Sequence, residues 1–204
     1  MSTPLTNPRR CLLFVPGSRP ERFDKAVATG ADQVCIDLED AVAPADKQTA
    51  RAAVLAYLAD APAGHSEIGL RVNPVSSDLG RADLSALAAS AARPAFVMLP
   101  KVESAAELAA ADALLAGLDT QFIVQIETPK GLLDARQIVA ASTRVQALMF
   151  GGFDYIVALR GRACWESFFH PRVQLATVAA EADVGCMDVP FLDIKDQAGL
   201  VEET

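Results

Sequence analysis

The sequence predicts an α/β domain in which short buried strands alternate with helices around a parallel sheet. Short apolar runs recur along the 204 residues, and the stretches between them carry apolar residues near positions i, i+3 and i+4, as amphipathic helices do. The interiors of the runs are apolar at consecutive positions, which is typical of strands buried on both faces. Both patterns indicate a parallel sheet covered by helices.

The expected strands are Leu12–Val15, Gln33–Asp37, Ile68–Val72, Ala95–Leu99, Phe122–Ile126, Gln146–Phe150 and Gly185–Val189. The expected helices are Glu21–Thr29, Asp46–Leu58, Leu84–Ala91, Ala105–Ala116, Gly131–Ala141 and Trp165–Ala182. Ser104 and Glu107 have the spacing of a capping box at the start of one helix. No composition break or Gly/Ser-rich linker divides the chain, so we expect a single domain over residues 1–204.

Strict alternation of strand and helix fits either a closed barrel or an open doubly wound sheet. No GxGxxG or GxxxxGK[ST] loop follows an expected strand, which disfavours a nucleotide-binding open sheet. In a barrel the functional groups lie at the carboxyl ends of many strands, and this sequence concentrates its polar residues there. The sequence therefore favours the barrel.

Composition limits the partners and the compartment. A net charge of -8 and a pI near 4.7 argue against binding to nucleic acid or to an anionic membrane, so small molecules or copies of the chain are the expected partners. No apolar run is long enough for a signal-peptide core or a membrane span, and we expect a cytoplasmic protein. Cys11, Cys35, Cys164 and Cys186 form no CxxC pair and are expected to be buried free thiols.

Charged residues follow the second, third and fourth expected strands. Glu39 and Asp40 belong to an acidic cluster that needs a compensating cation or donors, although loop capping and solvent exposure are alternatives. Arg71 could grip a carboxylate in bidentate fashion, or form a salt bridge to the acidic cluster. Lys101 could be read as a Schiff-base lysine, but it lies beyond a proline and next to Glu103, so a supporting ion pair or an outward position is the favoured interpretation.

Glu127 and Asp154 follow the fifth and sixth expected strands, which are neighbours in such a sheet. Two carboxylates together with waters and substrate oxygens suit Mg²⁺. The sequence therefore predicts that both bind this ion. Zinc is disfavoured because His65 and His170 have no second histidine or cysteine at ligand spacing.

A glycine loop follows the first expected strand. Pro16, Gly17, Ser18 and Arg19 could hold an anion through backbone N–H groups, although an ordinary strand-to-helix turn is an equal alternative.

Six segments occur in a family-specific order along the chain: RRCLLFVPGSRPERFDKA, DQVCIDLEDAVAPADKQTAR, LRVNP, VMLPKVES, VQIETPKGLL and MFGGFDY. In these segments the chain resembles the citrate lyase β-subunit-like (HpcH/HpaI aldolase) family. The resemblance continues through MDVPFLDIKDQAGLVEE and covers essentially all 204 residues. It implies a TIM-type (β/α)8 barrel, commonly assembled as a homotrimer or larger homo-oligomer.

The resemblance also implies a reaction. Members make or break a carbon–carbon bond between an acyl-CoA thioester, such as citryl-CoA or malyl-CoA, and a 2-oxo acid. Carried over by position, Glu127 and Asp154 bind Mg²⁺ and Arg71 holds the oxo-acid carboxylate. Mg²⁺ chelated by the oxo acid polarises its carbonyl, which agrees with the physical reading of an all-oxygen site.

The remaining candidates receive supporting roles from the resemblance. Glu39 and Asp40 are expected in the acidic surroundings of the site and, with Arg71, are the candidate catalytic residues. Glu127 is expected to contact the substrate as well as the metal, and residues 16–19 to lie near the thioester or its nucleotide. The eighth strand and helix of the family barrel have no match in these 204 residues. The sequence therefore leaves three readings open: a fragment, a chain that a partner completes, or a longer protein.

Three functions follow from the sequence. The first is an Mg²⁺-dependent carbon–carbon lyase acting on a short 3-hydroxyacyl-CoA. The second is a non-catalytic or regulatory remnant, motivated by the unmatched eighth unit. The third is hydrolysis of a malyl-type thioester, which uses the same metal site.

Overall fold

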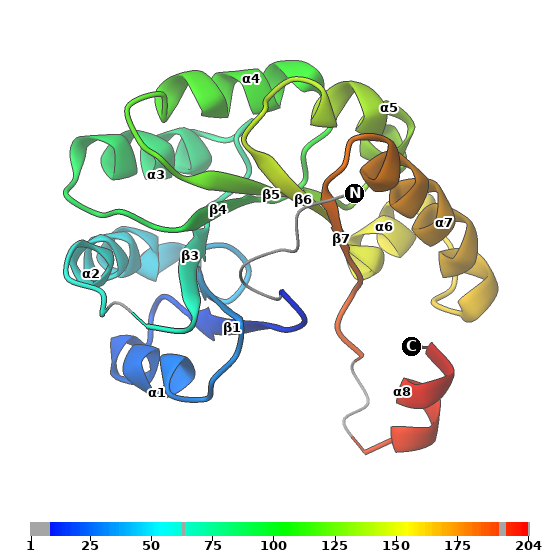
Figure 1. The fold of residues 1–204 in the computed structure, drawn as a ribbon, viewed down its shortest axis with the longest axis horizontal. Helices are drawn as coiled ribbons and strands as arrows, with labels where there is room; N and C mark the ends of the chain where they lie inside the picture. The colour runs from blue at the N-terminus through cyan, green and yellow to red at the C-terminus, as the bar shows by residue number, and fades with distance from the viewer. Residues whose placement is uncertain (1–8, 63, 192–194, 204) are drawn as a thin grey trace.

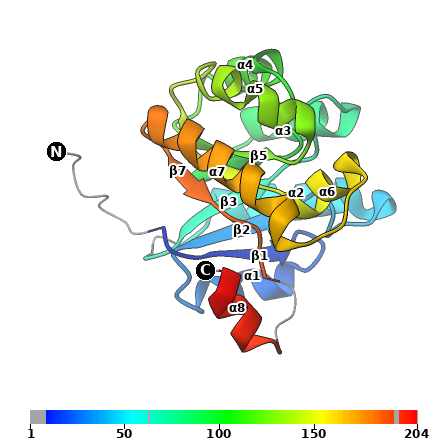
Figure 2. The ribbon, with the colours of Figure 1, turned by 90° about the vertical axis from the view of Figure 1, so that its right-hand side faces the viewer.

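The computed structural model describes residues 9–62, 64–191 and 195–203. Within these residues, seven parallel strands form one sheet in chain order from β1 to β7. The sheet curls, helices α1 to α5 and α7 lie along its outer side, and α8 lies apart from it (Figures 1 and 2). Among the described helices none is long and apolar enough to cross a membrane.

The strands confirm the expected runs, with differences only at their ends. They are β1 Leu12–Pro16, β2 Gln33–Asp37, β3 Glu67–Arg71, β4 Phe96–Leu99, β5 Gln121–Ile126, β6 Val145–Phe150 and β7 Gly185–Met187. Each strand pairs with the next in parallel register, so all carboxyl ends lie along one edge of the sheet. Polar residues at that edge are thereby brought together.

The helices cover the stretches expected between the strands. They are α1 Phe23–Val27, α2 Lys47–Ala59, α3 Asp78–Ala89, α4 Ala105–Leu114, α5 Pro129–Val139, α6 Gly152–Leu159, α7 Trp165–Glu181 and α8 Gln197–Glu203, with 3-10 turns at Pro20–Arg22 and Pro44–Asp46. The capping box is confirmed at α4, where Ser104 Oγ accepts from Glu107 N at 3.3 Å and Glu107 Oε2 accepts from Glu103 N at 2.8 Å. Helices α6 and α8 were not expected.

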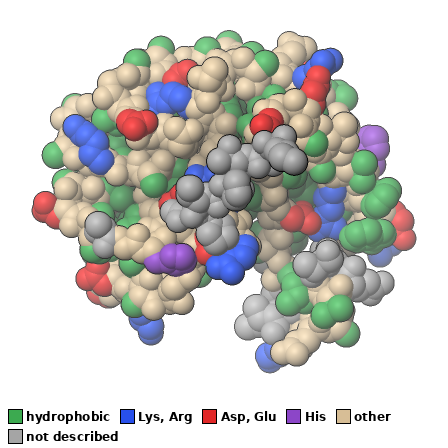
Figure 3. All heavy atoms as spheres, viewed as in Figure 1, with side chains coloured by type: hydrophobic (Ala, Val, Ile, Leu, Met, Phe, Trp, Pro, Cys, Tyr) green, Lys and Arg blue, Asp and Glu red, His purple; other side chains and the backbone are tan. Residues whose placement is uncertain are grey.

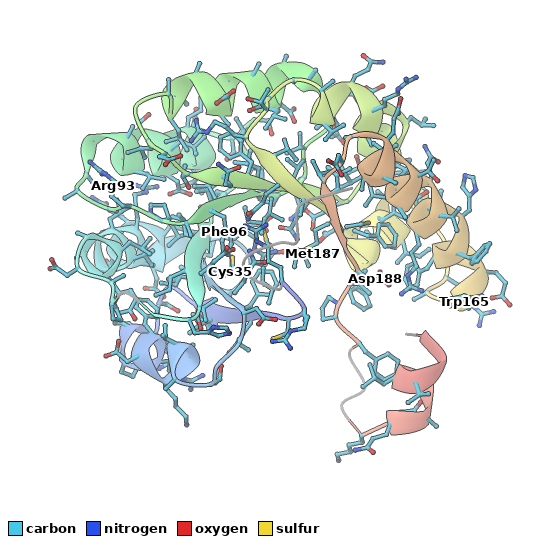
Figure 4. The ribbon with its side chains drawn as sticks, in the orientation of Figure 1. Cys35, Arg93, Phe96, Trp165, Met187 and Asp188 are labelled. Atoms are coloured by element: carbon cyan, nitrogen blue, oxygen red, sulfur yellow. The ribbon has the colours of Figure 1, made fainter. Side chains whose placement is uncertain are left out.

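Apolar side chains fill both sides of the sheet. The larger cluster packs between the sheet and its helices. A second cluster fills the inside of the curl and contains Cys35, Phe96, Met98, Ile123, Ala147 and Met149; Cys35, Phe96 and Met187 lie within the curl in Figure 4. The ring of Phe96 needs a neighbour without a side chain, because a Cβ at Gly69 would collide with its backbone and ring. The inside is therefore a packed core.

The expectation of buried cysteines is wrong for three of the four. Only Cys35 is buried, whereas Cys11, Cys164 and Cys186 are exposed. Cys186 lies in β7, which pairs on one side only with β6 among the described strands. Cys11 precedes β1 and Cys164 precedes α7. All four thiols are free, as expected.

Candidate active site

Charged side chains from five consecutive strands converge at the carboxyl end of the sheet. Asp37 and Arg71 are the last residues of β2 and β3, and the register places them opposite each other. Lys101 follows β4, Glu127 follows β5, and Asp154 lies in the first turn of α6 directly after β6. The strands position these groups, because parallel neighbours end at the same edge.

Arg71 is held by two carboxylates. Its Nε and Nη2 donate to Asp37 Oδ1 and Oδ2 at 2.8 and 2.6 Å, and its Nη1 lies 3.1 Å from Glu39 Oε2. The guanidinium carbon also lies 5.0 Å from the centre of the Phe14 ring. The salt bridge to the acidic cluster, one of the two predicted roles, is therefore present.

Lys101 makes the supporting ion pair that the sequence favoured. Its Nζ donates to Glu39 Oε1 at 2.7 Å, and lies 3.6 Å from Asp40 Oδ2 and 3.9 Å from Asp154 Oδ1. Burial opposes the charge, but the hydrogen bond to Glu39 and the three carboxylates raise the pKa of Lys101 to about 12. The ammonium is therefore charged at neutral pH, which excludes an unprotonated Schiff-base nucleophile in this state.

Glu127 is buried close to the charged side chains of Glu39, Lys101 and Asp154. The backbone N–H of Lys101 donates to its Oε2 at 2.8 Å. Its side chain lies against Gly151, where any Cβ would collide with the carboxyl group. Burial, followed by the charges of Glu39 and Asp154, raises the pKa of Glu127 to about 7. A bound cation would favour the ionised carboxylate.

The acidic loop after β2 is shaped by Asp37. Its two oxygens accept from the backbone N–H groups of Glu39 and Ala41 at 2.8 and 3.0 Å. Sequence reasoning considered this capping role for Asp40, whose side chain is 61% exposed and whose carboxylate faces Lys101 instead. Glu39 is buried, and this burial raises its pKa despite the nearby cations Arg71 and Lys101.

A pocket of about 200 Å³ opens beside these charges. Its walls include Phe14, Arg71, Gln125, Glu127, Asp154 and Pro190. Gln125 is buried, and its Oε1 has no hydrogen-bond partner among the described residues. Since a buried acceptor without a partner is costly, this oxygen is suited to a donor on a bound molecule. No sequence pattern singled out Gln125, which lies near the end of an apolar strand.

Lys47, at the start of α2, binds the loops that carry the acidic residues. Its Nζ donates to Leu38 O, Glu39 O and Asn73 Oδ1 at 2.7, 2.6 and 2.8 Å. Asn73 is fixed in turn by Asp83, whose Oδ2 accepts from its side-chain amide at 2.6 Å. This buried network joins the loops after β2 and β3. Sequence reasoning missed it, because a lysine at a helix start is usually exposed.

Comparisons with known proteins show the family of the chain. The model of the HpcH/HpaI aldolase/citrate lyase family matches residues 10–204. The chain belongs to this family. It is 33% identical to an L-malyl-CoA/beta-methylmalyl-CoA lyase of Cereibacter sphaeroides, over 96% of this chain and 70% of that protein. It is 28% identical to the citrate lyase subunit beta of Leuconostoc mesenteroides, over 96% and 68%.

Solved structures give the same family. The crystal structure of RipC from Yersinia pestis matches with a TM-score of 0.84 and 33% identity, over 97% of this chain and 83% of that one. A citrate lyase beta subunit from M. tuberculosis complexed with oxaloacetate and magnesium matches with a TM-score of 0.77 and 37% identity, over 94% and 83%.

The residues of this family member fit a magnesium ion in their chemistry. Glu127 and Asp154 offer carboxylate oxygens at one rim, and Gln125 Oε1 is an unsatisfied acceptor in the same pocket. No cluster of three or more His, Cys, Asp or Glu able to hold a metal occurs in the described part of the chain. Mg²⁺ commonly takes one or two protein carboxylates and completes its coordination with water and substrate oxygens.

The glycine loop lies at a different pocket. Gly17, Ser18 and Arg19 line a cavity of about 450 Å³ together with residues of α2. None of the residues lining it also lines the pocket beside Glu127. Pro16 ends β1, and the N–H of Gly17 donates to Asp37 O at 2.8 Å. The loop is therefore tied to the acidic cluster through the backbone.

Proposed function

We propose that this protein is an Mg²⁺-dependent carbon–carbon lyase that cleaves or forms a short 3-hydroxyacyl-CoA, yielding acetyl-CoA or a homologue and a 2-oxo acid. The observation that carries the proposal is the pair Glu127 and Asp154 beside a pocket that also contains Arg71. The printed activities of malyl-CoA lyase, citramalyl-CoA lyase and citrate lyase beta subunit relatives support the same reaction class.

Each residue has a defined task in this proposal. Glu127 and Asp154 hold the metal, and Arg71 orients the carboxylate of the oxo acid. When bound, Mg²⁺ supplies a Lewis acid that stabilises negative charge on the reacting oxygen. Glu39 and Asp40 set the charge of the surroundings through Lys101 and Arg71. The buried side of the pocket keeps bulk water away from Glu127.

The same proposal includes the architecture and the thioester. A curled sheet of successive parallel strands with an outer layer of helices is the geometry of a TIM-type barrel, so we assign residues 1–204 to one such domain. Residues 16–19 and their cavity are proposed to lie along the CoA thioester. We also propose a cytoplasmic homo-oligomer, which light scattering and cell fractionation test.

Calorimetry tests the metal site first. Mg²⁺ is titrated into the purified chain with oxaloacetate present, for the unmodified protein and for Asp154→Ala. Asp119→Ala is the matched control, because Asp119 is exposed in the loop before β5, at the opposite end of that strand. Coupled binding that is lost only in Asp154→Ala supports the site. Equal binding by all three proteins contradicts it.

Product analysis then separates the two reactions that this site could support. With malyl-CoA as the substrate, a lyase releases glyoxylate and acetyl-CoA, whereas a thioester hydrolase releases malate and free CoA. Free CoA formed without glyoxylate would contradict the lyase proposal while leaving the metal site intact. Absence of both products from a protein that binds Mg²⁺ and oxaloacetate would favour the non-catalytic alternative.

A further inference from the structure

Lys101 touches the candidate metal site in two independent ways. Its backbone N–H donates to Glu127 Oε2 at 2.8 Å, and its ammonium bonds to Glu39 Oε1 at 2.7 Å. Its φ of 53° lies in the left-handed region, which is strained for a residue with a side chain. The chain adopts this conformation where both groups of one residue meet the acidic cluster.

The ammonium occupies a position that suits a metal cation. It lies between carboxylates of two segments, 2.7 Å from Glu39 and 3.6 Å from Asp40 in the loop after β2, and 3.9 Å from Asp154 in α6. Asp154 is one of the two candidate metal ligands, and Lys101 N–H holds the other, Glu127. A positive charge this close to the ligands opposes the approach of a second cation.

We propose that Lys101 is a resident counter-cation of the metal site. Its N–H positions Glu127 for the metal, while its ammonium neutralises the acidic cluster and weakens the binding of a bare divalent ion. Lys101 is thus a positioning residue rather than a catalytic one. The inference rests on the proposed function, since it concerns how the same site takes its metal.

A purely structural role does not account for these contacts. The acidic loop is already fixed by Lys47, which bonds to the carbonyls of Leu38 and Glu39, and by Asp37, which accepts from two backbone N–H groups. Lys101 adds no bond to that loop's backbone. Among the described residues its ammonium pairs with carboxylates alone, and 30% of its side chain is exposed.

Mn²⁺ binding separates this role from a structural one. Lys101→Met removes the ammonium but keeps the backbone N–H and a side chain of similar length, and Lys101→Arg keeps the charge. Binding is measured at pH 8 without any oxo acid, from the electron paramagnetic resonance signal of free Mn²⁺. We expect Lys101→Met to bind Mn²⁺ about tenfold more tightly, because a nearby repulsive charge is gone, and Lys101→Arg to stay within about twofold.

Equal or weaker Mn²⁺ binding by Lys101→Met with an unchanged circular dichroism spectrum overturns the inference. Lys101→Gln, which is also neutral but can still bond to Glu39, gives the same readout if the methionine variant does not fold. Adding Glu127→Gln to Lys101→Met must abolish the gain in Mn²⁺ affinity, which shows that the gain arises at this site. Failure of every variant and the unmodified protein to bind Mn²⁺ overturns the proposed function as well, whereas binding without a gain overturns only the role of Lys101.

Discussion

Ion pairs lie at both ends of the curled sheet, but the balance between carboxylates and cations differs between the two ends. At the amino end, Arg9 donates to both oxygens of Glu67 at 2.9 and 3.0 Å, and Arg10 binds Asp32 through its guanidinium at 2.9 and 3.1 Å. In these two pairs each carboxylate has an arginine partner. The pairs hold the chain before β1 against the sheet.

At the carboxyl end the carboxylates outnumber the cations. Asp37, Glu39, Asp40, Glu127 and Asp154 share the two cations Arg71 and Lys101, and among the described residues no other cation lies within salt-bridge distance of them. Excess negative charge next to a pocket is costly in the absence of a cation. The two ends therefore differ in the balance between carboxylates and cations rather than in the presence of ion pairs, and the excess of carboxylates marks the carboxyl end as the candidate site.

The largest expected difference between the ends is in turnover. Glu127→Gln removes a metal-binding charge and should lower kcat/KM for malyl-CoA cleavage by about 1000-fold, because the developing negative charge loses its stabilisation. Glu67→Gln, the same substitution at the amino end, should keep activity within about threefold, because it touches only the scaffold. Steady-state assays of glyoxylate release compare them. More than a tenth of the activity in Glu127→Gln contradicts the proposed ligand.

The next effect is on stability. Lys47→Met leaves two carbonyls and Asn73 Oδ1 without their donor in a buried network, and should lower the free energy of unfolding by about 3 kcal/mol. Lys130→Met is the control, because Lys130 is exposed and has only a long pair to Glu103 at 3.4 Å. Urea unfolding monitored by circular dichroism measures both. If Lys47→Met and Lys130→Met are equally stable, the hydrogen bonds of Lys47 do not stabilise the acidic loop.

The contributions of the two ends to the free energy of unfolding should also depend on pH in opposite directions. The pKa of Glu127 is raised to about 7 from its ordinary 4.5, so its contribution to stability is fully present below 4.5 and lost as the pH rises through 7. The hydrogen bonds from Arg10 lower the pKa of Asp32, so its contribution is present above its ordinary pKa and lost only in acid.

Metal-free protein in EDTA should therefore lose about 2–3 kcal/mol of unfolding free energy between pH 5 and 8 through Glu127, a loss that Glu127→Gln should not show. Asp32→Asn should differ from the unmodified protein by a constant amount over the same range. Urea titrations at the two pH values test this. Parallel pH curves for the unmodified protein and Glu127→Gln would contradict the raised pKa.

The smallest expected effect concerns two buried glutamines. Gln33 and Gln125 each have an Oε1 without a hydrogen-bond partner among the described residues, but Gln33 binds Glu67 at the amino end and Gln125 lines the pocket. Gln125→Leu should lower kcat/KM about tenfold with little change in stability, because it removes an unpaired acceptor from a residue that lines the pocket. Gln33→Leu should leave kcat/KM unchanged. Equal activity of the two variants removes Gln125 from the site.

Much of the fold and the site could be predicted from the sequence because their signals are local. The strands read as consecutive apolar runs, and every expected run is a strand. Their order along the chain is also their order in the sheet, so polar residues at successive strand ends had to meet at one edge. Glu127 and Asp154 were singled out in this way, and the family motifs around them are contiguous in the chain.

Local patterns failed where the environment depends on neighbours. Helix α6 begins at Gly152, so Asp154 lies in a helical turn rather than in a loop; its apolar sequence directly after β6 gave no boundary. The exposure of Cys186 follows from its position in β7, and the apolar pattern around it indicated burial. On α7, the large side chains of Trp165, Phe169 and Val173 are likewise exposed. Figure 3 shows hydrophobic side chains on the surface at the right-hand side of the molecule, where Figure 1 places α7.

The strand order, the residue types at the strand ends and the family can be inferred from the amino-acid sequence alone. The pairing of the charges can be known only from the tertiary structure, because Lys101 and Glu39 are 62 residues apart in the chain and Arg71 and Asp37 are 34 residues apart. An ion pair depends on distances of a few ångströms and on burial, and neither is encoded in the spacing of residues along a strand or helix. The left-handed backbone of Lys101 and the buried ammonium of Lys47 are consequences of that three-dimensional arrangement.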